Sequence, residues 1–125
     1  MLWLLESSGY AYKEILASEI LADDRTLAEL VRRLVEAFQP ERILLFGSKA
    51  RGEAGPDSDY DLLVLVGDGA PTERRRSRKA YQAFRGTRTA ADVLVWSQQE
   101  FERRLHVTAS LPATINREGI LLYAR

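Results

Sequence analysis

Apolar positions along this chain are either spaced like one face of a helix or gathered in the short runs typical of buried strands. The clearest helical pattern is made by Leu27, Leu30, Val31, Leu34, Val35 and Phe38. Thr26 and Glu29 form a possible capping box at the start of this helix, and Pro40 stops it. Looser helical spacing predicts a further helix over residues 11–22.

Short apolar runs predict strands at residues 42–46, 59–66, 91–96 and 120–123. The segments between them predict helices over 73–84, over 98–105 and from Pro112 to Gly119. Thr72 is positioned to cap the first of these helices, and Ser97 with Glu100 forms a capping box at the start of the second.

Helices interleaved with strands predict an α/β (α+β) fold, in which a small mixed sheet has helices packed on one face. The other face would then be free for a site. We expect a single domain over residues 1–125, with an N-terminal helical extension at 1–22 and a catalytic core at 23–125.

Composition supports a globular domain, since 46% of the 125 residues are hydrophobic and 29% are charged. Lys plus Arg balance Asp plus Glu at 18 each, so no overall field favours nucleic acid or an anionic membrane. The absence of cysteine excludes disulfides and thiolate metal sites and suits a reducing compartment. The apolar start of the chain lacks a basic region and is interrupted by Glu6, so we expect a cytoplasmic protein without a signal peptide or membrane span.

Acidic residues gather where a predicted core strand begins, in the stretch LFGSKARGEAGPDSDYDLLV at residues 45–64. On a strand, alternate side chains share a face, so Asp59 and Asp61 point one way while Tyr60 points the other. Asp92 begins the next predicted strand and would complete a cluster of three carboxylates if the two strands were neighbours. Such oxygen ligands suit Mg²⁺.

Residues just upstream are suited to binding a phosphate. Gly47 would let the backbone approach a phosphate closely, and Ser48 adds a hydroxyl and an amide donor. Lys49 and Arg51 lie within reach of the same ligand. A phosphate-binding turn followed by metal-binding acids suits phosphoryl or nucleotidyl transfer with two metal ions about 3.5–4 Å apart.

Each feature alone also has an ordinary explanation. A Gly-Ser pair after a strand is usually only a turn, an Asp-x-Asp at a strand start is often solvated, and a lone Asp92 is more often a strand-edge acid. The basic stretch at residues 73–79 is expected to be a solvated helix face, and His106 a surface or cap residue.

In combination, these features resemble the signature of the polymerase-beta-like nucleotidyltransferase superfamily. The resemblance is greatest to the minimal nucleotidyltransferases (MNT), antitoxins that are paired with HEPN toxins and typically read FGSxARGxxxxxSDxDLLV. The matching residues here are Phe46, Gly47, Ser48, Ala50, Arg51, Gly52, Ser58, Asp59, Asp61, Leu62, Leu63 and Val64. The resemblance extends over about residues 27–123.

The resemblance implies roles for particular residues. Asp59, Asp61 and Asp92 would be catalytic and would hold two Mg²⁺ ions, with Asp92 helping to activate the attacking hydroxyl. Gly47 and Ser48 would hold the triphosphate of ATP. Lys49 stands where arginine is common in the family, and Arg51 could equally pair with a nearby acid and order the loop.

The implied reaction transfers AMP from ATP to a tyrosine of a HEPN toxin in a homo- or hetero-oligomer. A small-molecule nucleotidyltransferase of the aminoglycoside-modifying kind is an alternative, although such enzymes usually carry a further acceptor-binding domain. A third possibility is an antitoxin that neutralises its partner by binding alone. The apolar residues of the extension, including Trp3, Leu4 and Leu5, are expected either to dock on another chain or to pack on their own domain.

Overall fold

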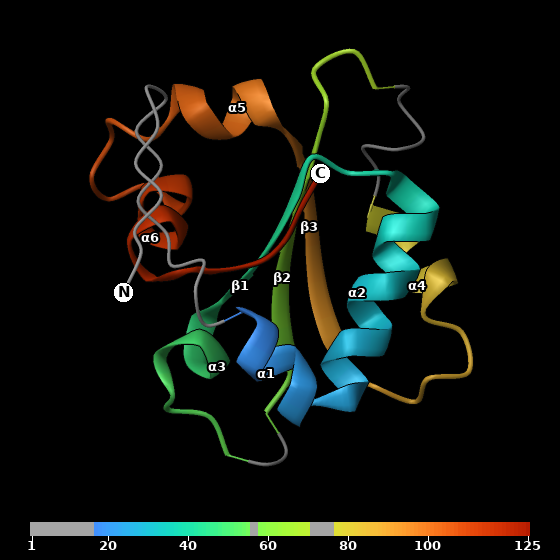
Figure 1. Cartoon of the computed structure of the whole chain (residues 1–125). Helices are drawn as coiled ribbons and strands as arrows, with labels where there is room; N and C mark the ends of the chain where they lie inside the picture. Colours follow the sequence, from blue (N-terminus) through green and yellow to red (C-terminus); the bar gives the residue numbers. More distant parts are fainter. Residues whose placement is uncertain (1–16, 56–57, 71–76) are drawn as a thin grey trace.

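The computed structural model describes residues 17–55, 58–70 and 77–125 (Figure 1). Its helices are α1 (Ala17–Asp23), α2 (Arg25–Phe38), α3 (Gly47–Arg51), α4 (Ser77–Ala83), α5 (Gln98–Arg103) and α6 (Leu111–Glu118). Its strands are β1 (Arg42–Phe46), β2 (Tyr60–Val66), β3 (Ala91–Ser97) and β4 (Ile120–Ala124). The predicted packing of residues 1–16 and the predicted cap at Thr72 lie outside the described residues.

The strands form one mixed sheet in the order β3-β2-β1-β4. β1 pairs antiparallel with both β2 and β4, whereas β2 and β3 are parallel. The parallel pair is possible because the long connection through α4 returns the chain to the same end of the sheet, as a parallel crossover requires. The mixed α/β fold predicted from the sequence is confirmed.

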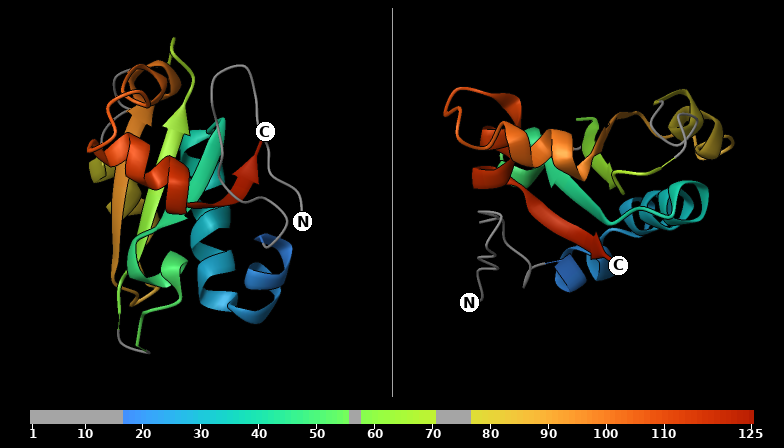
Figure 2. Two further views of the ribbon diagram at one scale, coloured as in Figure 1. Left: turned by 90° about the vertical axis from the view of Figure 1, so that its left-hand side faces the viewer. Right: turned by 90° about the horizontal axis from the view of Figure 1, so that it is seen from above.

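Helices lie on both faces of the sheet, whereas the sequence analysis expected them on one face only (Figure 2). On the first face, α2 packs on β1 and β2 through a core that includes Leu30, Leu34, Phe38, Leu45 and Leu62, and α4 packs against α2 and β3. On the second face, a smaller core forms under α5 and α6, and its buried members are Leu44, Leu63, Leu65, Phe101, Ile115 and Leu121. We refer to these as the α2 face and the α5–α6 face.

Helix α2 begins earlier than the sequence predicted. Its N-cap is Asp24, whose Oδ1 accepts a hydrogen bond from the backbone N–H of Leu27 at 3.0 Å. The predicted capping box at Thr26 and Glu29 is therefore wrong, because Thr26 already lies inside the helix and Glu29 pairs with arginines one turn further on. The predicted end is confirmed, since the helix finishes at Phe38, shortly before Pro40.

The short elements of the second half follow the sequence closely. Ser97 and Glu100 form the predicted capping box of α5. Gly119 is the C-cap of α6, as predicted, and a Cβ at this position would lie only 2.5 Å from the carbonyl oxygen of Ile115. Glycine is thus needed here for close packing of the chain against the end of the helix.

None of the helices within the described residues is long and apolar enough to cross a membrane.

Candidate active site

Pairing between β2 and β3 brings two of the predicted acids together. Asp61 and Asp92 are partners in the parallel register, so their side chains leave adjacent strands at the same level. Asp61, Leu63 and Leu65 are alternate residues of β2, so their side chains point to the same face. Leu63 and Leu65 belong to the core of the α5–α6 face. The two carboxylates therefore lie on the α5–α6 face, where the strands begin.

Gly47 lies against one of these carboxylates. Its neighbour Phe46 is the register partner of Asp61 on β1, and the chain then turns into α3 with a φ of +74° at Gly47. A Cβ at Gly47 would overlap Oδ2 of Asp61 and lie 3.0 Å from its Cγ. Only glycine satisfies both the left-handed backbone and this close approach.

The surroundings of Asp61 disfavour its negative charge. Burial raises the pKa of the Asp61 carboxyl above its ordinary value, and the nearby carboxylates of Asp92 and Asp59 raise it further, while Arg51 acts in the opposite direction. No ion pair joins any of these three carboxylates to a residue of the described ranges. A bound cation would relieve this repulsion.

Asp59 lies just before β2 and is exposed, as is Asp92 on β3. Within the described part of the chain, no group of three or more His, Cys, Asp or Glu side chains is arranged as a ready metal site. The donor set fits a hard divalent cation in its chemistry, because it consists of carboxylates on one face of the sheet. Asp61 and Asp92 form the paired part of this set, and Asp59, just before β2, lies near enough for its charge to act on Asp61.

The residues predicted to bind phosphate are distributed over α3. Gly47 and Ser48 form its first turn, beside Asp61, where the sequence analysis had expected only a turn. Lys49 has a different environment, because its ammonium lies 4.5 Å from the ring centroid of Tyr60. Tyr60 points to the opposite face of β2 from Asp61, so the structure does not place Lys49 with the acids.

Arg51 contacts two carboxylates outside the acidic cluster. Its Nε donates to Glu53 at 2.6 Å, and its Nη1 donates to Glu118 of α6 at 3.4 Å. These contacts match the alternative in which Arg51 orders the loop. They also connect α3 to α6 across the α5–α6 face.

Tyr60 and Asp24 are residues that the sequence analysis did not assign to the site. The Tyr60 hydroxyl donates to Oδ2 of Asp24 at 2.7 Å, and burial together with this carboxylate raises the pKa of Tyr60 to about 12. Tyr60 therefore connects the segment between the two acids to the start of α2, and its ring connects to Lys49 on α3. The position of Tyr60 between the two aspartates was the only signal in the sequence, and it did not reveal these partners.

Comparisons with known proteins show the family to which the chain belongs. The family model described as "Nucleotidyltransferase domain" matches residues 27–116. No curated protein matches the chain. The chain belongs to the nucleotidyltransferase domain family, and its predicted place in the polymerase-beta-like superfamily is confirmed.

The solved structures that resemble this chain are distant in sequence. One is a protein from Sulfolobus solfataricus described as a nucleotidyltransferase, with 23% identity, a TM-score of 0.55 and coverage of 87% of each chain. Another is a toxin-antitoxin with AMP-PNP, with 22% identity and a TM-score of 0.50, which covers 77% of this chain and 72% of that one. A third, the toxin-antitoxin MntA-HpeT, has 17% identity, a TM-score of 0.48 and coverage of 76% and 71%.

Proposed function

We propose that this nucleotidyltransferase domain transfers AMP from ATP to a hydroxyl group of an acceptor, with Mg²⁺ as cofactor. The observation that carries the proposal is the pairing of Asp61 with Asp92 directly beside Gly47. This arrangement brings negatively charged oxygen ligands next to a point where the backbone can approach a phosphate closely.

Residues on three segments would bind the nucleotide and Mg²⁺ and accept the proton. Gly47 and Ser48 would hold the triphosphate through backbone and hydroxyl donors at the start of α3. Asp59, Asp61 and Asp92 would hold Mg²⁺, which supplies neutralisation of phosphate charge and a lower pKa for the attacking hydroxyl. Asp92 is exposed and stands at the outer strand of the sheet, so its carboxylate can also accept the proton of an arriving hydroxyl.

The proposed transfer is a displacement at the α-phosphorus of ATP. The acceptor oxygen forms a bond to the α-phosphorus as the bond from that phosphorus to the bridging oxygen breaks. Pyrophosphate leaves, and the hydroxyl proton passes to a carboxylate of the site. The product is an AMP ester of the acceptor.

We further propose that the acceptor is a tyrosine of a HEPN-type toxin and that this chain is its MNT antitoxin. Two observations support this narrower proposal. The stretch from Phe46 to Val64 has the wording of the MNT signature. A solved structure of similar fold is a toxin-antitoxin with AMP-PNP, an analogue of ATP.

Intact-mass spectrometry tests the proposal directly. The chain is incubated with ATP, Mg²⁺ and a HEPN-type protein, taken from the neighbouring reading frame if that frame encodes one, and one or more AMP masses should appear on a partner tyrosine. The Asp59→Asn protein should bind the partner without modifying it. A complex that forms without any adduct would instead identify an antitoxin that acts by binding alone.

A further inference from the structure

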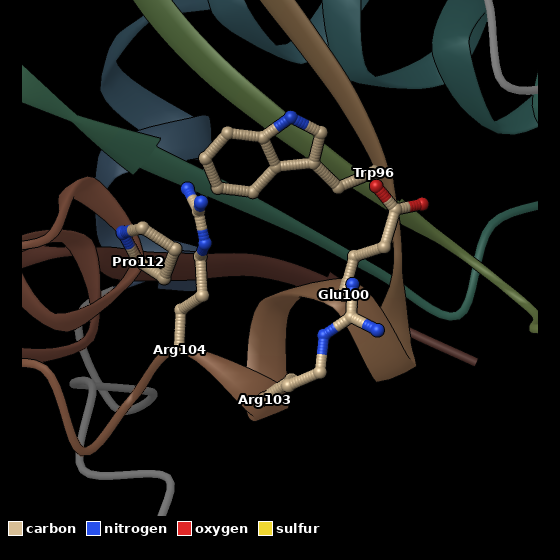
Figure 3. A pocket seen from close by; sticks show the side chains of 5 residues that line it. All are labelled: Trp96, Glu100, Arg103, Arg104 and Pro112. Atoms are coloured by element: carbon tan, nitrogen blue, oxygen red, sulfur yellow. The ribbon is translucent and has the colours of Figure 1, made fainter.

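A pocket of about 260 Å³ lies on the α5–α6 face, away from the acids, and is lined by Trp96, Glu100, Arg103, Arg104 and Pro112 (Figure 3). Its side chains come from the end of β3, from α5 and its C-cap, and from the first turn of α6. In the close-up, the Trp96 ring, the Arg104 side chain and the Pro112 ring face one another across the hollow.

The pocket has a net positive charge, since two arginines and one glutamate line it. Within the described ranges, neither the Arg103 nor the Arg104 side chain forms an ion pair or a hydrogen bond. Glu100 is already engaged, because its Oε1 accepts the backbone N–H of Ser97 in the capping box. Two exposed guanidiniums beside an indole are thus available to a ligand with carboxylates.

Two exposed apolar side chains lie in the chain segment that follows these arginines. Among the described residues the exposed large hydrophobics are Tyr81, Val107 and Leu111, and the last two lie in the connection from α5 to the start of α6. They are 46% and 44% exposed, and Trp96 is itself only partly buried. Tryptophan and arginine beside exposed apolar residues are typical of the energetically important centres of protein interfaces.

The connection that presents these residues is held by hydrogen bonds. The carbonyl oxygen of Arg104 accepts from the N–H of Val107 at 3.0 Å and from Oγ of Ser110 at 2.9 Å. Arg117 on α6 donates to the carbonyl oxygen of Thr108 at 3.1 Å. A loop ordered in this way loses little conformational entropy when a partner binds.

The pocket shares its sheet face with the candidate active site. Asp92 and Trp96 are four positions apart on β3, so their side chains point to the same face about 13 Å apart along the strand. An extended polypeptide held at Trp96 would need only a few residues to reach the acids. Arg51 on α3 also donates a hydrogen bond to Glu118 on α6. This contact connects α3, which carries the predicted phosphate-binding residues, to the helix whose first turn lines the pocket.

From these observations we infer that Trp96, Arg103, Arg104, Val107, Leu111 and Pro112 form a docking surface for an acidic segment of the acceptor protein. Carboxylates of that segment pair with Arg103 and Arg104, and its apolar or aromatic residues pack on Trp96 and Pro112. A nucleic acid suits the surface less well, because only two arginines line the pocket and the chain has no net positive charge to attract an extended phosphate backbone. This inference rests on the proposed protein acceptor but concerns binding, which requires neither ATP nor Mg²⁺.

A fluorescein-labelled peptide can test the surface. The peptide carries a Leu-Tyr-Leu core between runs of glutamate, and its binding is followed by fluorescence anisotropy in the absence of nucleotide. The double variant R103E/R104E should weaken binding about tenfold or more, and R103Q/R104Q should weaken it less. The matched control R78E/R85E makes the same change of charge at exposed arginines on and after α4, and should bind as the unchanged protein does.

The location of the peptide is read separately. In the Trp3→Phe variant, Trp96 is the remaining tryptophan, and its indole N–H resonance should shift as the acidic peptide is added. Lack of binding by the acidic peptide, equal binding of a peptide with glutamine in place of glutamate, or equal losses in R103E/R104E and in the control R78E/R85E would overturn the inference. Peptide binding by an Asp61→Asn protein that transfers no AMP would leave the docking surface intact, whereas undiminished transfer to the full partner protein by R103E/R104E would remove it.

Discussion

The α2 face and the α5–α6 face of the sheet differ in how completely their apolar side chains are covered, and β3 shows the difference within one strand. Val93 and Val95 point to the α2 face and are 3% and 7% exposed, whereas Leu94 and Trp96 point to the other face and are only partly buried. Asp92, the register partner of Asp61, points to the same face as Leu94 and Trp96. At β3 the α2 face is therefore closed, and the incompletely covered α5–α6 face leaves room for a substrate.

Substitution of Asp61 tests whether the α5–α6 face carries the catalytic site. Asp61→Asn should lower the rate of AMP transfer by about two to three orders of magnitude, as expected when an electrostatic group is removed from an active site. Its free energy of unfolding should stay the same or rise, because the charge that Asp92 and Asp59 repel is lost. Transfer rates and urea unfolding curves measure both effects. Unchanged transfer would exclude Asp61 from the mechanism.

Truncations on the two faces should differ in their cost to stability. Leu62→Ala removes a fully buried side chain from the α2 face and should lower the free energy of unfolding by about 2–5 kcal/mol. Leu94→Ala, on the partly covered face, should cost about 1 kcal/mol, since less apolar area returns to water. Equal losses in urea unfolding would mean that α5 and α6 cover their face as well as α2 does.

Gly47→Ala tests the close approach between α3 and β2. An alanine there would need a positive φ and would overlap Asp61, so we expect a loss of about 1–3 kcal/mol in stability together with a loss of nucleotide binding. Gly52→Ala is a suitable control, because Gly52 has the same φ of +74° but no atom near an added Cβ. If the two variants behaved alike, backbone strain alone would explain the requirement for glycine.

The stability of the protein should depend on pH through Asp61. A folded-state pKa above the ordinary value of 3.8 means that the folded protein holds this proton more tightly than the unfolded chain does. The contribution of Asp61 is therefore complete below the ordinary pKa and is lost as the pH rises through the raised one. Across this window the Asp61→Asn variant should gain stability relative to the unchanged protein, as measured by urea unfolding at successive pH values, and Mg²⁺ should reduce the difference.

Tyr60→Phe should have the smallest effect. The variant loses the hydrogen bond to Asp24 but keeps the ring under Lys49, so we expect a loss of about 0.5–1.5 kcal/mol in stability. If Tyr60 positions the acids, the Michaelis constant for ATP should change with little change in the fold, which circular dichroism can check. An unaltered Michaelis constant would leave Tyr60 with a structural role alone.

Much of this fold follows from local patterns. The apolar run that became β2, the alternation that places Asp61 opposite Tyr60, and the Ser97–Glu100 capping box are all short-range features that act within a few residues. The cap of α2 was missed because it is Asp24, directly after the end of α1 at Asp23, and where α1 ends is not fixed by the apolar pattern of α2. The cover provided by α5 and α6 could not be predicted, since these short helices are placed by tertiary packing.

In the candidate site, too, features set by local spacing could be predicted, whereas those set by long-range contacts could not. Spacing predicted that Asp59 and Asp61 share a face, and the pairing of Asp61 with Asp92 needed only the assumption that the two strands are neighbours. The position of Lys49 depends on the ring of Tyr60, and that of Arg51 depends on Glu118, which lies 67 residues further along the chain. Such long-range partners leave no trace in a local motif.

The parallel pairing of β2 and β3 also has a consequence for protein engineering. The connection between them starts with a turn closed by the hydrogen bond from the N–H of Ala70 to the carbonyl oxygen of Gly67, and at Gly69 an added Cβ would meet no other atom. A reporter peptide inserted after Gly69 would lengthen the connection without altering the strand register. Deletion of Ala91, by contrast, would move Asp92 by one position and turn its carboxylate to the α2 face, so this enzyme should accept added length far more readily than the loss of one residue.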